Sequence, residues 1–389
     1  MIERPQRMEA VAGALGQYAV AAILGPRQCG KTTLARAFAQ GRECEFFDLE
    51  SPVDAARLAT PMLALEDLTG LVVIDEIQRK PELFSILRVL VDRPESKARF
   101  LVLGSASPHL VKGASESLAG RIGFIDLSGF SLSEVGADRD DNLWNRGGFP
   151  RSFLAADDAL SAQWRDDFIR TFLERDIPQL GITIPAETLR RFWTMIAYYH
   201  GQVWNAAAFA RSLGVSGTTA RRYLDILSGA FMVRQIQPWH SNTKKRQVKS
   251  PRIYLRDSGL LHALLSLETL SDVLSHPKVG ASWEGFVIEE ILASVRSRDF
   301  YFWSTYSGAE LDGLLFRRGR AVGFEIKRTD APTRTKSMIS AIQELDLEHL
   351  YVVYPGKQSY RVDDQITALS IRDLDSVMAA GESNISFEF

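Results

Sequence analysis

The sequence predicts an α/β protein with two mixed units joined by a helical middle. In the first third, short apolar runs such as YAVAAIL and GLVVID alternate with helical patterns. Continuous apolar strands separated by helices are typical of a parallel sheet covered on both faces. After about Gly136 the pattern becomes helical, and from about Ser250 strands and helices alternate again. We therefore expect a nucleotide-binding type of parallel-sheet domain at 1–135, a helical lid or linker at 136–187, a winged-helix domain at 188–255 and a second α/β domain at 256–389.

Length and charge limit the function classes. The chain has 389 residues, which favours more than one domain, and a formal net charge of −2. Any nucleic-acid binding must therefore come from local basic patches. The two cysteines, Cys29 and Cys44, show neither a pairing pattern nor zinc-site spacing. No apolar run reaches the length of a membrane span, so we expect a cytoplasmic protein without a membrane partner.

The first chemical motif is a complete phosphate-binding loop, GPRQCGKTT, which follows the apolar run YAVAAIL and opens a helical pattern. In such a loop, backbone N–H groups and the helix N-terminus hold phosphates. We expect Lys31 to reach the β- and γ-phosphates of ATP and Thr32 to hold Mg²⁺. We also expect the thiol of Cys29 to line the site, where alkylation would block ATP binding. The predicted nucleotide-binding residues are Gly25, Pro26, Arg27, Gln28, Cys29, Gly30, Lys31, Thr32 and Thr33.

Two adjacent acids, Asp75 and Glu76, end the apolar run LVVIDE downstream of this loop. Phosphoryl transfer to water needs one carboxylate near the magnesium and another group that orients the attacking water. The sequence therefore predicts Asp75 as the magnesium residue and Glu76 as the water-orienting residue.

Ser105 and Arg121 are further candidates for contact with the γ-phosphate. Ser105 ends the run RFLVLGS and would point at the γ-phosphate if this strand lies beside LVVID; an N-cap for the next segment is the alternative. Arg121 lies in SLAGRIGF, where it would reach the nucleotide of a neighbouring subunit in a homo-oligomer such as a ring. A surface salt bridge is the alternative for Arg121.

The middle of the chain contains a helix–turn–helix pattern at 206–230. Gly214 marks the turn, and Ser216 can cap a second helix whose apolar residues Tyr223, Leu224 and Leu227 would pack inward. Such a second helix can enter the major groove of DNA. Packing between domains, with a solvated basic loop, is the alternative. The residues expected to face DNA are Thr218, Thr219, Arg221 and Arg222 on the helix, and Lys244, Lys245, Arg246 and Lys249 in the wing loop.

The C-terminal unit carries a second chemical set at a predicted hairpin. Asp312 lies near the start of one strand, and Glu325 and Lys327 are two apart on the next, so they share a face. Two carboxylates can bind Mg²⁺ or Mn²⁺, and a nearby lysine can stabilise charge on an attacked phosphate. Glu284, on the preceding helix, is expected to complete the metal set, with Glu289 as a second candidate on that helix. A charged strand edge with a salt bridge is the alternative.

Taken together, these motifs resemble a widespread prokaryotic family of AAA-superfamily ATPases whose C-terminal half is a domain of unknown function. The resemblance covers nearly the whole chain. It implies a winged helix in the middle and a restriction-endonuclease-like (PD-(D/E)XK) C-terminal fold. The motifs that carry it are GPRQCGKTTLARAF, LVVIDEIQRKPELFSILR, FLVLGSAS, SLAGR, GGFP, FLERDI, YLRDSGL, WEGFV and FEIKR.

By that resemblance, the ATPase positions are Lys31, Thr32, Asp75, Glu76 and Arg121, and the nuclease-fold positions are Glu284, Asp312, Glu325 and Lys327. The chain departs from the family at Gly313, where an aromatic residue is common, and we expect a looser hairpin there.

Three functions fit these patterns. The first is an ATP-driven enzyme that grips or cuts DNA, including branched or single-stranded DNA, as a metal-dependent deoxyribonuclease. The second is a nucleotide-dependent switch whose inactive nuclease fold binds DNA or a protein. The third, a protein-remodelling ATPase, leaves the basic wing and the C-terminal acids without a use.

Overall fold

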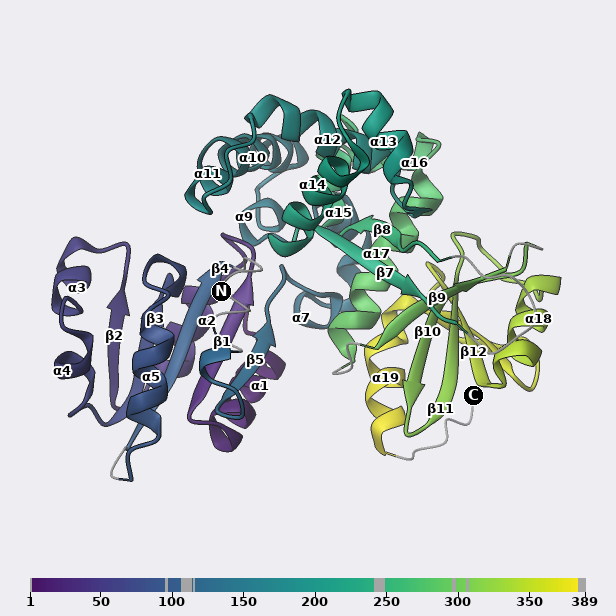
Figure 1. The fold of residues 1–389 in the computed structure, drawn as a ribbon. Coiled ribbons are helices and arrows are strands. Elements are labelled where there is room, and N and C mark those ends of the chain that lie inside the picture. The colour runs from purple at the N-terminus through teal and green to yellow at the C-terminus, as the bar shows by residue number, and fades with distance from the viewer. Residues whose placement is uncertain are drawn as a thin grey trace. The chain divides into compact units, whose positions relative to one another are not determined.

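The computed structural model describes residues 2–94, 97–105, 114, 116–240, 249–295, 299–305 and 308–383 (Figure 1). The chain divides into two compact units. Unit 1 comprises Met1–Gly129 with Gly229–Phe231, and unit 2 comprises Phe130–Ser228 with Met232–Phe389. Both units are mixed α/β, which confirms the predicted fold class. Within the described ranges, no helix is long and apolar enough to cross a membrane.

Unit 1 is built on a five-stranded, fully parallel sheet in the order β2-β3-β4-β1-β5. Its strands are β1 (Val20–Gly25), β2 (Cys44–Asp48), β3 (Gly70–Asp75), β4 (Ala98–Ser105) and β5 (Ile122–Asp126). Strands β1, β3 and β4 correspond to the apolar runs YAVAAIL, GLVVID and RFLVLGS. Figure 1 shows them side by side with helices along the sheet. The helical elements are α1 (Pro5–Gln17), α2 (Lys31–Ala39), α3 (Pro52–Arg57), α4 (Pro61–Leu65), η1 (Ile77–Arg79) and α5 (Leu83–Val91).

The carboxyl ends of these strands meet at one edge of the sheet. Gly25 at the end of β1 pairs with Ser105 at the end of β4, and Asp48 pairs with Asp75. Helix α5 packs its apolar stripe, which includes Leu83 and Leu87, into the core beneath the sheet. A rigid apolar layer therefore supports the edge where the polar residues gather.

Unit 2 begins with a group of helices, drawn from blue to teal in Figure 1. They are α7 (Leu132–Val135), η2 (Ala137–Arg139), α8 (Asp140–Arg146), α9 (Pro150–Phe153), α10 (Asp158–Thr171), η3 (Phe172–Asp176), α11 (Ile177–Gln179), α12 (Ala186–Tyr198), α13 (Ala206–Leu213) and α14 (Gly217–Gly229). Three further helices, α15 (Ser258–Leu264), α16 (Leu270–Ser275) and α17 (Val279–Ser294), follow the segment expected to form a wing.

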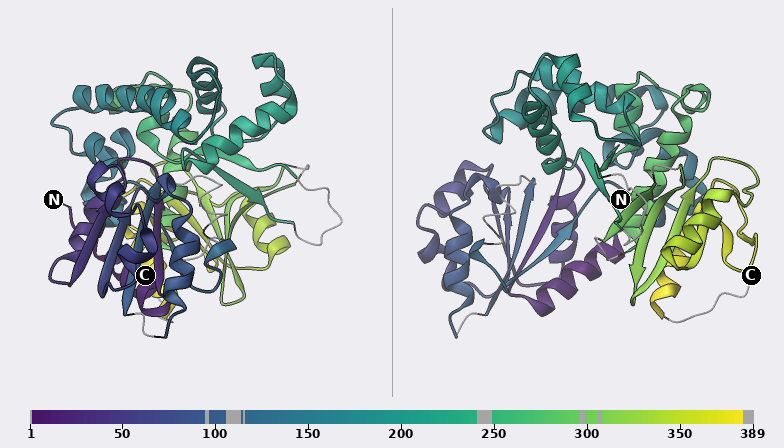
Figure 2. Two further views of the ribbon diagram at one scale, coloured as in Figure 1. Left: turned by 60° about the vertical axis from the view of Figure 1, so that its left-hand side comes forward. Right: turned by 45° about the vertical axis from the view of Figure 1, so that its right-hand side comes forward.

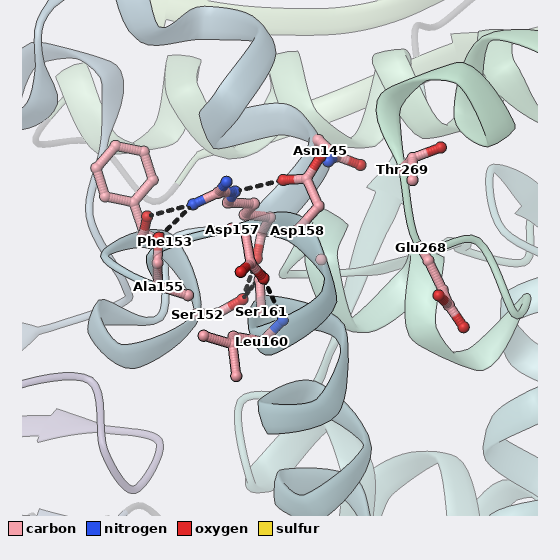
Figure 3. Close-up of polar contacts among 12 residues, drawn as sticks. Asn145, Ser152, Phe153, Ala155, Asp157, Asp158, Leu160, Ser161, Glu268 and Thr269 are labelled. Atoms are coloured by element: carbon pink, nitrogen blue, oxygen red, sulfur yellow. Dashed lines mark hydrogen bonds and ion pairs between the residues drawn. The ribbon is translucent and has the colours of Figure 1, made fainter.

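Polar contacts fix the junction between α8, α9 and α10 (Figure 3). Asp157 caps α10 by accepting a hydrogen bond of 2.8 Å from the backbone N–H of Leu160, and the hydroxyls of Ser152 and Ser161 lie 2.8 Å apart. The fully buried guanidinium of Arg165 donates to the backbone carbonyls of Ser161, Asn145, Gly259 and Glu268. One side chain thereby satisfies carbonyls from four different segments of unit 2.

A nine-stranded mixed sheet forms the rest of unit 2, in the order β13-β14-β12-β11-β10-β9-β7-β8-β6. Its strands are β6 (Gln202–Val203), β7 (Val233–Pro238), β8 (Arg252–Leu255), β9 (Phe300–Ser304), β10 (Glu310–Arg317), β11 (Arg320–Ile326), β12 (Leu347–Tyr354), β13 (Tyr360–Arg361) and β14 (Ile366–Ser370). Helices α18 (Lys336–Leu345) and α19 (Leu374–Ser383) complete the unit, with η4 (Ile371–Asp373) between strand and helix.

The strands of the expected wing belong to this same sheet. Strand β7 pairs with β8 and also, in parallel, with β9. Figure 2 shows from two further sides how these teal strands continue into the yellow-green C-terminal strands. The middle segment and the C-terminal segment thus share main-chain hydrogen bonds, while the four-domain division of the chain remains a prediction.

The hairpin of β10 and β11 is not loosened at Gly313, contrary to the expectation from the sequence. A Cβ atom at Gly313 would lie 2.4 Å from a ring carbon of Phe300 and 3.1 Å from Cβ of Phe324. The ring of Phe300 therefore fills the space that a larger side chain would take. The tight turn itself uses positive φ angles at Arg318 and Gly319.

A buried histidine connects α8, α15 and α17. The Nδ1 of His262 lies 2.9 Å from the carbonyl oxygen of Asn145, so it must donate, and Nε2 lies 2.7 Å from the hydroxyl of Ser282, from which it accepts. Trp144 donates to that same hydroxyl at 3.0 Å. This arrangement requires neutral imidazole, and burial lowers the pKa of His262 to about 3.

We predict that unit 2 loses stability when the pH falls below about 6.5. The folded-state pKa of His262 lies below the ordinary value of about 6.5, so its contribution is complete above that pH and is lost as the pH falls. The slope for one such group is about 1.4 kcal/mol per pH unit. His262→Gln should flatten the slope relative to wild type, and His240→Gln, at an exposed position, should not.

Tryptophan fluorescence in denaturant titrations measures this effect. All seven tryptophans of the chain lie in unit 2, so their emission reports on that unit. Equal slopes for wild type and His262→Gln would contradict the prediction.

Candidate functional site

The phosphate-binding loop connects β1 to α2 at the carboxyl edge of the parallel sheet. A Cβ atom at Gly25 would lie 2.0 Å from the carbonyl oxygen of Leu127, so only glycine fits there. Gly30 caps α2 with a φ of 97°, in the left-handed region that favours glycine. The two glycines of the motif are therefore needed for two different steric reasons.

Lys31 is buried inside this loop, at the first residue of α2. Its ammonium donates hydrogen bonds to the carbonyls of Gly25 at 3.1 Å and Pro26 at 2.7 Å. Burial raises the carboxyl pKa values of Asp75 and Glu76, and the charge of Lys31 partly offsets this effect. The charge of Lys31 thus interacts both with the loop that would hold phosphates and with the acids at the end of β3.

Thr32 and Asp75 meet as a magnesium site requires. The hydroxyl of Thr32 donates to Oδ2 of Asp75 at 2.7 Å, and the backbone N–H of Glu76 donates to Oδ1 at 2.9 Å. Burial raises the pKa of Asp75 above its ordinary value. Both side chains present hard oxygen donors, which fit Mg²⁺. These residues suit the ion that P-loop ATPases use, and we expect them to hold it beside the phosphates.

Glu76 is held in an unusual conformation next to this pair. Its φ is 56°, in the left-handed region, and burial raises the pKa of its carboxyl. The side-chain amide of Gln78 donates to Oε2 of Glu76, and the guanidinium of Arg27 lies 3.9 Å from the same oxygen. The predicted water-orienting carboxylate is therefore positioned by two polar side chains.

Gln78 is a candidate that sequence reasoning missed. Besides donating to Glu76, its side-chain oxygen accepts a hydrogen bond of 3.2 Å from the backbone N–H of Ser105. Gln78 thus bridges the ends of β3 and β4. The signal was present in the run DEIQ, since a polar residue two positions after the acid falls at the same sheet edge.

Ser105 lies at the predicted edge, paired with Gly25. Direct contact of its hydroxyl with the γ-phosphate remains a prediction. Arg121 lies just before β5, and its guanidinium bonds both carboxylate oxygens of Asp92 at 2.6 and 2.9 Å. That contact is the surface salt bridge considered as the alternative, while action on a neighbouring nucleotide stays a prediction.

The position of the Cys29 thiol argues against the expected block of ATP binding by alkylation, which stays to be measured. Cys29 is fully buried, and its Sγ lies 3.5 Å from the carbonyl oxygen of Leu127, behind the loop. Its backbone carbonyl accepts a hydrogen bond of 3.2 Å from Arg4, which also donates to the carbonyl of Gly129 at 2.8 Å. Arg4, at the start of α1, therefore braces the outside of the loop.

The C-terminal set is assembled in unit 2 on neighbouring elements. Lys327 lies 2.7 Å from Oε1 of Glu325, and Oδ2 of Asp312 accepts from the backbone N–H of Ile326 at 3.0 Å. Glu284, on α17, accepts from the hydroxyl of Tyr254 at 2.6 Å. Burial, followed by repulsion from Asp312, raises the carboxyl pKa values of Glu284 and Glu325.

A residue that the sequence reasoning missed, Arg252 on β8, lies at the centre of this set. Its guanidinium contacts Asp312 at 3.1 Å, Glu284 at 3.4 Å and Glu310 at 2.6 Å. In the part of the chain that the structure describes, no three His, Cys, Asp or Glu side chains form a group suited to a metal ion. The residues as arranged therefore do not fit the divalent ion expected at Glu284, Asp312 and Glu325. Glu289, the second candidate, instead pairs with Arg234 and Arg256.

The helix–turn–helix forms with the expected local signals. Gly214 ends α13 at a φ of 69°, and the hydroxyl of Ser216 accepts a hydrogen bond of 3.0 Å from the backbone N–H of Thr219. The apolar residues of α14 that were expected to pack inward are buried, namely Tyr223, Leu224 and Leu227. Thr218, Arg221 and Arg222 are exposed, Thr219 is partly buried, and Lys249 is exposed. Lys244, Lys245 and Arg246 lie outside the described residues.

Comparisons with known proteins assign an AAA domain to most of unit 1. A family model described as an AAA domain matches residues 17–136, and two domains of unknown function match 138–271 (DUF8612) and 279–374 (DUF4143). An uncharacterized protein of Mycobacterium tuberculosis (Rv2008c) is 52% identical over 382 residues, which cover 98% of this chain and 86% of the relative. An uncharacterized protein of Mycobacterium bovis (Mb2031c) matches to the same extent.

Solved structures show more distant likeness. A Walker-type ATPase of Pyrococcus abyssi aligns over 68% of this chain and 96% of its own length, with 14% identity and a TM-score of 0.49. A DNA replication initiation factor aligns over 55% of this chain and 70% of its own, with 13% identity and a TM-score of 0.25. We infer no function from either likeness.

We predict that Gln78→Ala slows ATP hydrolysis without weakening ATP binding. The variant removes the amide that positions Glu76, while Lys31 and the loop stay intact, so kcat should fall by about 10- to 100-fold. The dissociation constant for ATP should change by less than about threefold, and Gln17→Ala, at an exposed position, serves as the matched control. Steady-state turnover and nucleotide titration measure the two quantities. A weaker affinity with unchanged kcat would show that Gln78 supports the loop instead.

We also predict that alkylation leaves ATP turnover intact. The Cys29 thiol is buried, so a maleimide should modify Cys44, which is partly exposed, well before Cys29. Mass spectrometry of modified peptides gives the site, and Cys44→Ser should show almost no fast modification. Rapid modification of Cys29 that ATP prevents would restore the thiol to the nucleotide site.

Proposed function

Because this chain belongs to a family of AAA-domain proteins that carry a C-terminal domain of unknown function, we propose that it is an ATP-hydrolysing switch that acts on DNA. The AAA domain at residues 17–136 supports ATP binding and hydrolysis. The observation that carries it is the bond of 2.7 Å between Thr32 and Asp75, beside the buried Lys31.

The proposed hydrolysis uses residues of unit 1 alone. Lys31 exchanges its carbonyl partners for the β- and γ-phosphates, and the backbone N–H groups of the loop hold the remaining phosphate oxygens. Thr32 and Asp75 hold Mg²⁺, which neutralises phosphate charge when bound. Glu76, held by Gln78, orients the water that attacks the γ-phosphorus. The oxygen of that water bonds to the γ-phosphorus as the bond from this phosphorus to the bridging β–γ oxygen breaks, which gives ADP, phosphate and a proton that passes to solvent.

The proposed DNA contact is the exposed face of α14. Arg221 and Arg222 are adjacent and solvent-exposed, and Thr218 lies one turn before them, at the N-terminal end of the helix. In helix–turn–helix proteins, the N-terminal residues of the second helix contact base edges in the major groove. Arg221 also lies 3.2 Å from Asp225. Because this ion pair is exposed, exchange of Asp225 for a DNA phosphate would cost little free energy.

We propose further that unit 2 binds DNA without cutting it. Cleavage would need Glu284, Asp312 and Glu325 to hold a divalent ion, with Lys327 facing the scissile phosphate. Glu284 and Asp312 are instead bonded to Arg252. This geometry favours the switch over the deoxyribonuclease.

A homo-oligomer, with Arg121 acting on the nucleotide of a neighbouring subunit, remains part of the proposal. Arg121 would have to exchange Asp92 for phosphate, and its exposure permits that exchange. A reducing, cytoplasmic environment is consistent with the two free cysteines.

We predict that DNA stimulates ATP turnover through α14. Arg221→Ala combined with Arg222→Ala should reduce the slope of log affinity against log salt concentration by about 1 for each phosphate that the helix no longer neutralises. Stimulation should fall in parallel, while turnover without DNA stays unchanged. Lys31→Ala should abolish turnover altogether.

The matched control is Arg320→Ala, at an exposed arginine of the β10–β11 hairpin. The assay covers single-stranded, duplex and branched DNA, with product gels for cleavage. If no DNA stimulates ATP turnover, the proposed action on DNA is contradicted, while the proposed ATP hydrolysis is not affected. Metal-dependent cleavage that Asp312→Ala abolishes would favour the deoxyribonuclease.

A further inference from the structure

A pocket lies at the C-terminal set of acids, and its properties can be tested without DNA and without ATP hydrolysis. It measures about 440 Å³ and lies between β8, β10, the end of β11 and the start of α17. Arg252, Glu284, Glu310, Asp312 and Lys327 all line it. Most of the lining residues are therefore charged, and the chemistry of the pocket depends on how these charges pair.

Three carboxylates from two elements converge on a single guanidinium. Nη1 of Arg252 lies 3.1 Å from Oδ1 of Asp312 and 3.4 Å from Oε1 of Glu284, and Nη2 lies 2.6 Å from Oε2 of Glu310. The Arg252 side chain is only 9% exposed. The planar guanidinium also stacks on the ring of Phe302, with 4.9 Å between its central carbon and the ring centroid. Its position is thus fixed by charge on its nitrogens and by an aromatic face beneath it.

The hydrogen bonds leave few carboxylate oxygens for anything else. Oδ1 of Asp312 faces Arg252, and Oδ2 accepts from the backbone N–H of Ile326. Oε1 of Glu284 accepts from both Tyr254 and Arg252. A divalent ion takes carboxylate oxygens at about 2.0 to 2.6 Å, so an ion held by Oδ1 of Asp312 and Oε1 of Glu284 would have to displace the guanidinium.

A second arginine cluster of unit 2 provides a comparison. Glu289, also on α17, is held by Arg234 and by Arg256, which lies 3.3 Å away. That cluster pairs one acid with two arginines and does not line the pocket. The Arg252 cluster has the opposite balance, because three acids surround one arginine. Several carboxylates around one cation are also the usual surroundings of a divalent metal ion.

We propose that Arg252 is a built-in cation that takes the place of a divalent metal among Glu284, Glu310 and Asp312, so that this pocket binds no metal ion in the native protein. Guanidinium stays charged at every pH at which the protein is folded, so it is a permanent occupant. Removing it leaves Asp312 Oδ1 without its cationic partner. Oε2 of Glu325, whose carboxylate interacts electrostatically with Asp312, is buried and has no hydrogen-bond partner among the described residues even with Arg252 present, so it is a further oxygen donor for an ion.

The test measures Mn²⁺ binding to the full-length, nucleotide-free chain by the decrease of the free-ion EPR signal. The parent for this test is the Asp75→Asn chain, which lacks the carboxylate of the proposed magnesium site in unit 1, and all variants are made in this parent. The parent should bind no Mn²⁺ up to about 1 mM. Arg252→Gln should gain one site per chain, at least about tenfold tighter than any binding by the parent. Adding Asp312→Asn to Arg252→Gln should abolish that gain.

Arg256→Gln is the matched control, because it removes an arginine of the same segment that pairs outside the pocket; it should gain no site. Tryptophan fluorescence verifies that unit 2 is folded in each variant. The proposal is overturned if the parent binds one Mn²⁺ that Asp312→Asn removes, or if folded Arg252→Gln gains no site. Should Arg252→Gln not fold, the parent and its Asp312→Asn variant still decide the question.

Discussion

Parallel pairing of β1 with both β4 and β5 is the constraint on which the nucleotide site of unit 1 depends. It brings the carbonyl of Leu127, just after β5, so close to β1 that position 25 admits only glycine. It also sets the end of β4 beside the phosphate loop, within reach of Gln78. The apolar core under the sheet makes this register rigid, so the backbone of the loop needs few side-chain contacts of its own. Arg4 adds one such contact from the outer side.

Unit 2 is organised by the need to pair buried charges. Arg165 is satisfied by backbone carbonyls, and Glu289 by two arginines. Arg372, near the C-terminal helix, bonds both carboxylate oxygens of Asp140 at 3.0 Å, which ties chain segments 232 positions apart. Arg252 follows the same rule within a pocket. Charge pairing of this kind holds helices and sheet in a single arrangement, because a misplaced partner would leave an ion buried alone.

Local chemistry made much of this structure predictable. The P-loop, the acids of LVVIDE and the Gly214 turn depend on neighbours within a few residues, and each formed as the sequence indicates. The side-chain direction of Cys29 was not predictable, because it is set by Leu127, which lies 98 positions away. Arg252 was missed for the same reason: Asp312 follows it by 60 positions, and only the nine-stranded sheet brings them together. At Gly313, a distant ring supplied the bulk that the sequence lacks locally.

The left-handed backbone of Glu76 has a consequence for how unit 1 can change over time. A non-glycine residue in that region costs about 1 kcal/mol or more, and here the cost falls on the residue proposed to orient water. Glycine at position 76 would relieve that strain and remove the carboxylate in the same step. Selection for thermal stability alone would therefore favour glycine at this position. On the proposed role of Glu76, a homologue with glycine in its place would bind ATP and hydrolyse it slowly.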